Sequence, residues 1–276
     1  MRITGILAGV ALMAILALSS VSALRPPTVK EAAPWIDHRV NGMEYLVLEP
    51  AGYSPTQRYP VVLYLHQLDM GNDKPGLLRM VDSWFDTPQF RARHPAIIVV
   101  PLLDQSKDPE GRVINFGGKR DGHIGEDNTI AALHQVMAQY SVDPTRIYVT
   151  GNSLGGMGAW QMLLAYNTRT GTKGKLFAAG MPLAGAHRTA DPAQAAAALK
   201  DVPMWVIHGA KDKEVSLDWD RAMAKRMSGS RTFRYTEDAS LGHDVWDTYY
   251  RKPEVWNWLF SQSSAGGHEA IASPHK

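Results

Sequence analysis

The stretch RIYVTGNSLGGMGAW, residues 146–160, constrains the fold of this chain more than any other. Residues 147–150 are β-branched or aromatic and predict a buried strand, whereas the small residues that follow Ser153 are compatible with a helix. Between them, residues 151–155 read G-N-S-L-G, so a strand turns sharply into a helix. Side chains at the two glycine positions would collide where strand and helix approach closely, which explains why both positions are glycine.

A G-x-S-x-G motif in this context is typical of a nucleophile elbow, whose tight backbone lifts the serine hydroxyl to the carboxyl end of a sheet. Ser153 is therefore the predicted nucleophile. The motif is short enough to occur by chance, so the alternative is a Gly/Ser-rich loop without a catalytic role. Its position between a strand pattern and a helix pattern favours the elbow.

Strand and helix patterns alternate along most of the chain. Strands are predicted at residues 43–48, 61–65, 96–100, 147–150, 176–183, 202–207 and 232–235, and helices after Ser153 and at 84–93, 126–140, 193–199, 218–227 and 253–260. This alternation predicts an α/β fold with a mostly parallel central sheet and helices on both faces. The 276 residues are 45% hydrophobic, enough for one sizeable core, so one domain is predicted at residues 24–262.

A serine hydroxyl needs a base within hydrogen-bonding reach, and the base needs an acid that orients it. On this kind of scaffold the three residues follow the order Ser, Asp or Glu, His. His268 and His275 lie in a Ser- and Gly-rich tail, residues 263–276, that is predicted to be disordered. His243 lies in a loop between a strand and an aromatic-rich helix, and it is the predicted base. The alternative for His243 is a solvated loop histidine.

The orienting acid is expected directly after the strand at residues 202–207, because active-site loops gather at the carboxyl ends of parallel strands. Asp212 is the first carboxylate after that strand and is the predicted acid. Glu214 and Asp218 are close competitors. For all three residues, the alternative is a surface charge near a helix start.

A tetrahedral intermediate also needs donors for its oxyanion. The backbone N–H of Leu154, directly after the nucleophile, is one predicted donor, and that of Gln67 or Leu68, after the early strand, is the other. His66 is predicted to be a structural hydrogen-bonding residue at the end of that strand.

Two features are predicted to shape the substrate pocket. Residues 103–122 form a polar loop with a short hairpin near 113–116, and variable loops over a fixed sheet usually set specificity. Trp246 follows His243 by one helical turn and is a candidate for the pocket wall, whereas Trp160 and Trp256 are expected in the core.

Composition argues against several partners. The net charge is +2 with acids and bases interspersed, so nothing indicates nucleic acid or an anionic membrane surface. There is no cysteine, which rules out disulfides and thiolate metal sites. His66, His123, His187 and His208 show no ligand spacing such as H-E-x-x-H, so neither a metal nor any other cofactor is predicted.

The first 23 residues have the pattern of a secretory signal peptide. Arg2 supplies the positive region, residues 3–18 the apolar region, and residues 21–23 a small-residue cleavage site. Cleavage would leave a secreted or periplasmic chain that begins near Leu24 and has no stable membrane insertion. The alternative is an uncleaved anchor, which the nearby serines and the lack of a following positive cluster disfavour.

Four segments together resemble one group of proteins: YPVVLYLH, DPTRIYVTGNSLGGMGAW, PMWVIHGAKDKEV and GHDVWD. They resemble α/β-hydrolase-fold serine esterases of the predicted peptidase or phospholipase/carboxylesterase-like group, related to polyhydroxybutyrate depolymerases and to feruloyl and acetylxylan esterases. The likeness covers roughly residues 59–260. It implies an α/β-hydrolase fold with Ser153 as nucleophile, Asp212 as acid and His243 as base.

The sequence thus predicts a secreted serine esterase that cleaves a small-molecule or polymer-derived carboxylic ester through an acyl-enzyme. A peptidase with the same three residues is the closest alternative, because the fold does not choose between esters and amides. A catalytically silent binding protein is the other alternative, motivated by Gln67. Members of the group usually carry glycine after the histidine equivalent to His66, and a positive φ at that site would strain glutamine.

Overall fold

The computed structural model describes residues 35–103, 116, 119–120, 123–167, 176–187 and 191–264, all of which belong to the unit that begins at Ala33. The predicted signal segment, the hairpin residues 113–115 and the tail from residue 265 lie outside the described residues. Ser264 is described, and its backbone N–H donates to the carbonyl of Thr145 at 2.9 Å. No helix in the described ranges has the length and apolar character needed to cross a membrane.

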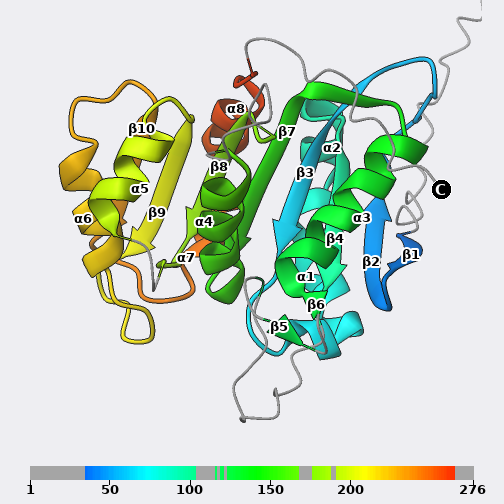
Figure 1. Cartoon of the computed structure of the whole chain (residues 1–276). Helices are drawn as coiled ribbons and strands as arrows, with labels where there is room; N and C mark the ends of the chain where they lie inside the picture. Colours follow the sequence, from blue (N-terminus) through cyan, green and yellow to red (C-terminus); the bar gives the residue numbers. More distant parts are fainter. Residues whose placement is uncertain are drawn as a thin grey trace, which may run out of the picture. The chain divides into compact units, whose positions relative to one another are not determined.

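Eight strands form one sheet in the order β1, β2, β4, β3, β7, β8, β9, β10 (Figure 1). β2 is antiparallel to β1 and β4, and every other pair in this sheet is parallel. The strands are β1 Ile36–Val40, β2 Met43–Leu48, β3 Tyr59–Leu65, β4 Ile97–Leu102, β7 Val142–Asn152, β8 Ala179–Leu183, β9 Met204–Gly209 and β10 Phe233–Asp238. A separate two-stranded hairpin consists of β5 (Lys119–Arg120) and β6 (His123–Ile124).

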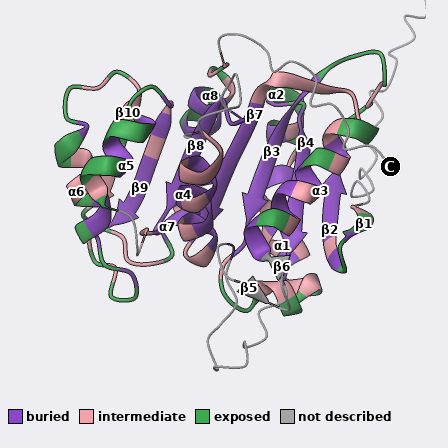
Figure 2. Cartoon of the chain, in the orientation of Figure 1, coloured by how far each residue is buried: buried purple, intermediate pink, exposed green. Residues whose placement is uncertain are grey.

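Helices cover both faces of the sheet, so the predicted α/β architecture is confirmed. They are α1 Lys74–Phe85, α2 Pro88–Arg93, α3 Gly125–Gln139, α4 Leu154–Tyr166, α5 Pro192–Leu199, α6 Asp218–Arg226, α7 Val245–Tyr249 and α8 Pro253–Phe260, with a short 3₁₀ helix at Met70–Asn72. Buried side chains of α3 to α6 pack in one core cluster, and those of α1, α2, α7 and α8 pack in another. Because successive residues of β3 point alternately into the two clusters, the whole strand is apolar; Figure 2 shows the central strands buried.

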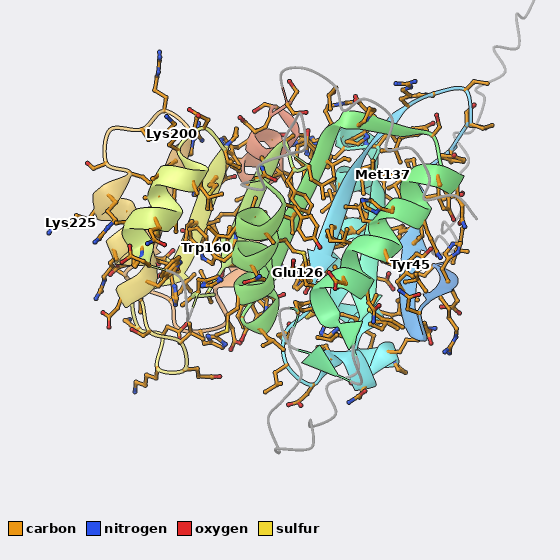
Figure 3. All side chains as sticks on the ribbon, in the orientation of Figure 1. Tyr45, Glu126, Met137, Trp160, Lys200 and Lys225 are labelled. Atoms are coloured by element: carbon orange, nitrogen blue, oxygen red, sulfur yellow. The ribbon has the colours of Figure 1, made fainter. Side chains whose placement is uncertain are left out.

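The predicted core tryptophans are in the core. Trp160 of α4 is fully buried and lies edge-on to Trp219 of α6, with ring centroids 5.7 Å apart. Trp256 is also buried and stacks on Tyr250. Figure 3 shows the contrast with Lys200 and Lys225, whose side chains extend away from the sheet.

The predicted helix at residues 84–93 is wrong in its bounds, because two helices meet there. α1 ends at Phe85 and α2 begins at Pro88. Thr87 is extended (φ −75°, ψ 143°), and its side chain accepts the N–H of Phe90 at 3.2 Å. A residue before proline is disfavoured in the helical conformation, so Thr87 caps a new helix and does not continue the first.

α1 begins at Lys74, well before the helix predicted at residues 84–93. The Asp73 side chain accepts the backbone N–H of Gly76 at 2.9 Å and so caps the helix. Pro75 lies in the first turn, where a missing N–H costs no hydrogen bond.

β1, at Ile36–Val40, forms where no strand is predicted from the sequence. It pairs with β2 through Asn41 and Gly42, both of which have positive φ (49° and 81°). Asn-Gly is the dipeptide that a two-residue hairpin turn of this kind favours.

Several strand ends also differ from the predictions: β7 begins at Val142 and not at residue 147, and β8 begins at Ala179 and not at residue 176. β4 continues through Pro101, which pairs with Tyr45, to Leu102. β9 is shifted to Met204–Gly209, so that His208 lies within the strand. β10 ends at Asp238 and not at residue 235.

Candidate functional site

Ser153 occupies a strained turn between β7 and α4. Its φ of 53° and ψ of −117° lie outside the regions that residues with a side chain usually adopt. The backbone is fixed by two hydrogen bonds, from the Ser153 N–H to the Leu183 carbonyl (3.0 Å) and from the Met157 N–H to the Ser153 carbonyl (2.9 Å). A strained conformation of this kind persists only where the surrounding contacts hold it in place, and it is common at active sites.

The two glycines of the motif stand where a side chain cannot. A Cβ at Gly151 would lie 2.4 Å from the Gly155 carbonyl oxygen, and one at Gly155 would lie 1.9 Å from the Leu65 carbonyl oxygen. The collision inferred from the sequence is confirmed.

We expect Gly155→Ala to lower the free energy of unfolding by about 3 kcal/mol, because the obstacle is the backbone of β3 and not a flexible side chain. Urea unfolding measures the change. Gly242→Ala is the matched control, since its Cβ would meet nothing closer than the Lys211 carbonyl oxygen at 3.8 Å. Equal stability of the two variants would contradict the expectation.

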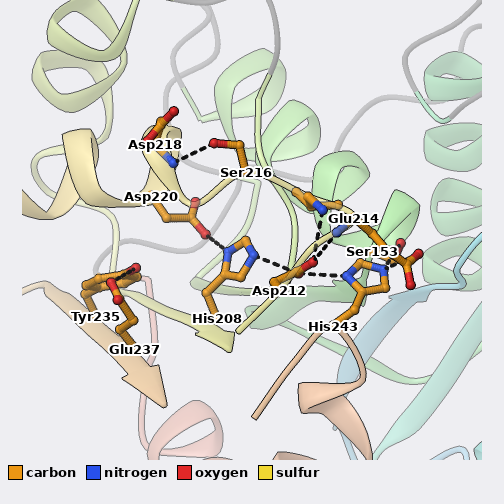
Figure 4. A network of polar contacts seen from close by, with 11 residues as sticks. Ser153, His208, Asp212, Glu214, Ser216, Asp218, Asp220, Tyr235, Glu237 and His243 are labelled. Carbon is orange, nitrogen blue, oxygen red and sulfur yellow. Dashed lines mark hydrogen bonds and ion pairs between the residues drawn. The ribbon is translucent and has the colours of Figure 1, made fainter. Parts of the chain in front are cut away.

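The three residues predicted to form the triad meet at the carboxyl ends of the strands (Figure 4). His243 Nε2 lies 2.8 Å from Ser153 Oγ, and His243 Nδ1 lies 2.7 Å from Asp212 Oδ2. The side chain of Asp212 is fully buried, and that of His243 is 10% exposed. Because an ionised carboxylate only accepts, Nδ1 carries the ring proton, which leaves Nε2 able to accept the proton of Ser153.

All four hydrogen-bond positions of the Asp212 carboxylate are used. Oδ1 accepts the backbone N–H groups of Glu214 (2.8 Å) and Val215 (3.0 Å), and Oδ2 accepts from His243 and from His208 Nε2 (3.0 Å). Burial would raise the pKa of Asp212, but the hydrogen bonds from His243 and the two backbone N–H groups outweigh it and lower the pKa. The carboxylate is therefore ionised at neutral pH.

None of the alternative acids or bases takes the position of Asp212 or His243 in the described part of the chain. Glu214 is 72% exposed, and its carboxylate lies 3.7 Å from Nε2 of His243, the nitrogen that faces serine. Asp218 is exposed in the first turn of α6. His268 and His275 lie outside the described residues.

The two predicted oxyanion donors flank the elbow. Leu154 is the first residue of α4, and N–H groups of a first turn have no partner within their helix. The side chain of Gln67 accepts from the amide of Asn152, and Asn152 in turn accepts the hydroxyl proton of Tyr64 at 2.6 Å. These contacts tie the loop after β3 to the residue that precedes Ser153.

The backbone of Gln67 does not have the positive φ that would strain a glutamine. The left-handed residue of this loop is Asp69 (φ 68°). His66 is fully buried, donates from Nδ1 to the Gln67 carbonyl (2.7 Å) and accepts the Leu103 N–H at Nε2 (3.2 Å). His66 therefore has the structural role that the sequence predicts.

Stability should depend on pH through His66. Burial lowers the pKa of His66 to about 4, although its hydrogen bond to Gln67 opposes the shift, whereas the unfolded value is about 6.5. Between these values the unfolded chain binds a proton that the native protein does not, so stability falls as the pH falls. We expect this residue to account for about 2 kcal/mol of the loss between pH 7 and pH 5.

The His66→Gln variant tests this, because its amide both donates and accepts but does not titrate. Urea unfolding at the two pH values should show a smaller loss for the variant than for the natural protein, whatever its stability at pH 7. An identical pH dependence in both proteins would contradict the expectation.

The predicted pocket features are only partly described. Trp246 lies edge-on to His243, with ring centroids 5.0 Å apart, and is 4% exposed. It therefore contacts the ring of His243 while belonging mainly to the core. Of the predicted loop at residues 103–122, only Leu103, Phe116 and residues 119–120 are described.

Two residues next to the predicted triad are not predicted to belong to the site. They are His208 and Asp220, which are both buried: His208 contacts Asp212, and Asp220 contacts His208. The available signal was the spacing of four residues between His208, at a strand end, and Asp212. In the described ranges, no group of three or more His, Asp or Glu side chains is placed to hold a metal ion.

Known proteins share this architecture. A thermostable esterase superposes with a TM-score of 0.64 at 23% identity, covering 83% of this chain and 63% of that one. The feruloyl esterase module of Clostridium thermocellum, in complex with sinapinate, superposes with a TM-score of 0.57 at 14% identity, covering 86% and 91%. These likenesses confirm the predicted α/β-hydrolase fold.

Sequence comparison gives the family. An Aspergillus terreus protein named "Probable feruloyl esterase C" is 28% identical over 119 residues, which are 42% of this chain and 39% of that protein. The chain thus matches well under half the length of this relative. The family model Esterase, described as "Putative esterase", matches residues 40–266, which is most of the chain. The chain therefore belongs to the esterase family.

Proposed function

We propose that this protein is a serine hydrolase of carboxylic esters, with Ser153 as nucleophile, His243 as base and Asp212 as orienting acid. One observation carries the proposal: a line of hydrogen bonds of 2.8 and 2.7 Å joins a serine on a strained elbow to a buried carboxylate through one imidazole. Membership of the esterase family supports an ester as the substrate.

The geometry permits the following reaction. Ser153 Oγ attacks the carbonyl carbon of the ester while its proton passes to Nε2 of His243, and Asp212 stabilises the imidazolium at Nδ1. The backbone N–H groups of Leu154 and Gln67 donate to the oxyanion. The C–O bond to the alcohol then breaks, and the alcohol leaves with the proton from His243. Water attacks the acyl-enzyme with His243 again as base, which releases the acid and restores Ser153.

The proposed substrate is a small-molecule or polymer-derived ester. The Aspergillus terreus relative is named as a feruloyl esterase, so methyl ferulate belongs beside p-nitrophenyl acetate in the first substrate panel. Peptide anilides belong there too, because a peptidase would use the same three residues. Faster turnover of anilides than of esters would replace the esterase proposal by a peptidase.

Labelling with a fluorophosphonate tests the activated serine directly. We expect the purified protein to be labelled at Ser153, as located by mass spectrometry, and the His243→Ala variant to remain unlabelled. No labelling of the natural protein would overturn the proposal and favour a silent binding protein on this fold.

We also propose export, to the periplasm or the medium, on the basis of the signal pattern of residues 1–23. Mass spectrometry of the exported protein should find a new N-terminus near Leu24. Retention of residues 1–23 on a membrane-bound protein would contradict cleavage.

A further inference from the structure

A second histidine and a second aspartate lie behind the triad carboxylate (Figure 4). His208 belongs to β9, and Asp220 lies in the first turn of α6. Nε2 of His208 is 3.0 Å from Asp212 Oδ2, and Nδ1 is 2.7 Å from Asp220 Oδ2. The side chains of all three residues are fully buried. One line of hydrogen bonds thus runs from Ser153 through the triad to Asp220.

The proton positions follow from the partners. Asp212 is ionised and only accepts, so His208 presents an N–H at Nε2. One further proton lies between Nδ1 of His208 and Asp220, either as an imidazolium beside a carboxylate or as a neutral ring beside a carboxylic acid. In both arrangements Nε2–H of His208 points at Asp212.

The electrostatic environment retains this shared proton. Burial raises the pKa of Asp220 to about 6. Burial alone would lower the pKa of His208, but the hydrogen bonds and charges of Asp220 and Asp212 outweigh it and raise the pKa. Glu237 of β10 lies opposite His208 of β9 in the sheet. Its carboxylate accepts hydrogen bonds from the Arg221 guanidinium at 2.7 and 2.9 Å and from the Tyr235 hydroxyl at 2.9 Å.

We propose that His208, held by Asp220, is a positioning residue that fixes the Asp212 carboxylate for His243. Two ring N–H groups converge on Oδ2, and two backbone N–H groups converge on Oδ1, so the carboxylate cannot turn without breaking a buried hydrogen bond. Without His208, only His243 would hold Oδ2, and the ring that must accept the Ser153 proton would lose its fixed partner. This inference rests on the proposed esterase function.

Two substitutions of the same residue separate positioning from a purely structural role. The amide nitrogen of glutamine reaches about the position of Nε2, and that of asparagine reaches about the position of Nδ1. His208→Gln therefore keeps a donor to Asp212 and loses the one to Asp220, whereas His208→Asn does the reverse. Both variants remove the ring, so both lose stability.

We expect His208→Asn to lower kcat by roughly tenfold to a hundredfold with little change in KM, because the Asp212 carboxylate loses the hydrogen bond that fixes its orientation. We expect His208→Gln to retain kcat within about threefold of the natural protein. Each kcat is calculated per folded molecule, with the folded fraction measured by circular dichroism. The ester substrate that the natural protein turns over fastest serves for all three proteins.

Each outcome decides a separate question. Equal kcat values in the two variants, or a lower value for His208→Gln, would overturn the positioning role while leaving the esterase function intact. Absence of labelling and turnover in the natural protein would instead overturn the esterase function. NMR of the ¹⁵N-histidine-labelled natural protein needs no variant to fold: Nε2 of His208 should carry a proton, and a bare Nε2 would refute the inference.

Discussion

Replacing Ser153 with alanine is expected to lower kcat for ester substrates by roughly 10⁴- to 10⁶-fold. The variant lacks Ser153 Oγ, which lies 2.8 Å from His243 Nε2, whereas the proposed oxyanion donors remain. Alanine is strained at φ 53° much as serine is, so the free energy of unfolding should change by no more than about 0.5 kcal/mol. Steady-state kinetics and urea unfolding measure the two quantities.

Ser216→Ala is the control for this substitution. Ser216 is exposed, and its hydroxyl accepts the backbone N–H of Asp218 in a hydrogen bond of 3.1 Å, so kcat should stay unchanged. If the Ser153→Ala protein still hydrolysed the ester at more than about 1% of the natural rate, another nucleophile would have to be found.

The placement of the three central residues could be predicted because each depends on local sequence. Ser153 is marked by glycines that only a close backbone approach explains, and the structure contains that approach. Asp212 and His243 each follow a strand of a parallel sheet, so topology alone brings both to the same edge. Chain order and strand ends were sufficient for these positions.

Other parts depend on contacts between distant segments, and sequence patterns do not reveal them. Asp220 reads as an ordinary acidic residue in a first helical turn, and only the tertiary placement of α6 brings it within hydrogen-bonding distance of His208. The start of α1 is not predicted for a different reason. Pro75 and Gly76 usually indicate a turn, although here their positions suit the first turn of a capped helix. β1 was not predicted either, although Asn41-Gly42 was an available signal for a hairpin turn.

Asp212→Asn is expected to lower kcat by about 10⁴-fold. An amide has one acceptor and one donor end, whereas the Asp212 carboxylate receives four hydrogen bonds and gives none. If the NH₂ group took the place of Oδ1, it would face the backbone N–H groups of Glu214 and Val215, which cannot change. The NH₂ group will therefore face the two histidine rings, which can change tautomer and accept from it.

That orientation has a definite chemical consequence. Nδ1 of His243 must then accept from the amide, so the ring proton moves to Nε2 and points at Ser153. A ring in this tautomer cannot take the serine proton, and the fluorophosphonate reaction should slow in parallel with kcat. Glu214→Gln is the matched control: its exposed carboxylate is 3.7 Å from Nε2 of His243, and its loss should change kcat less than about threefold. A large loss in Glu214→Gln with a small one in Asp212→Asn would transfer the role of orienting acid to Glu214.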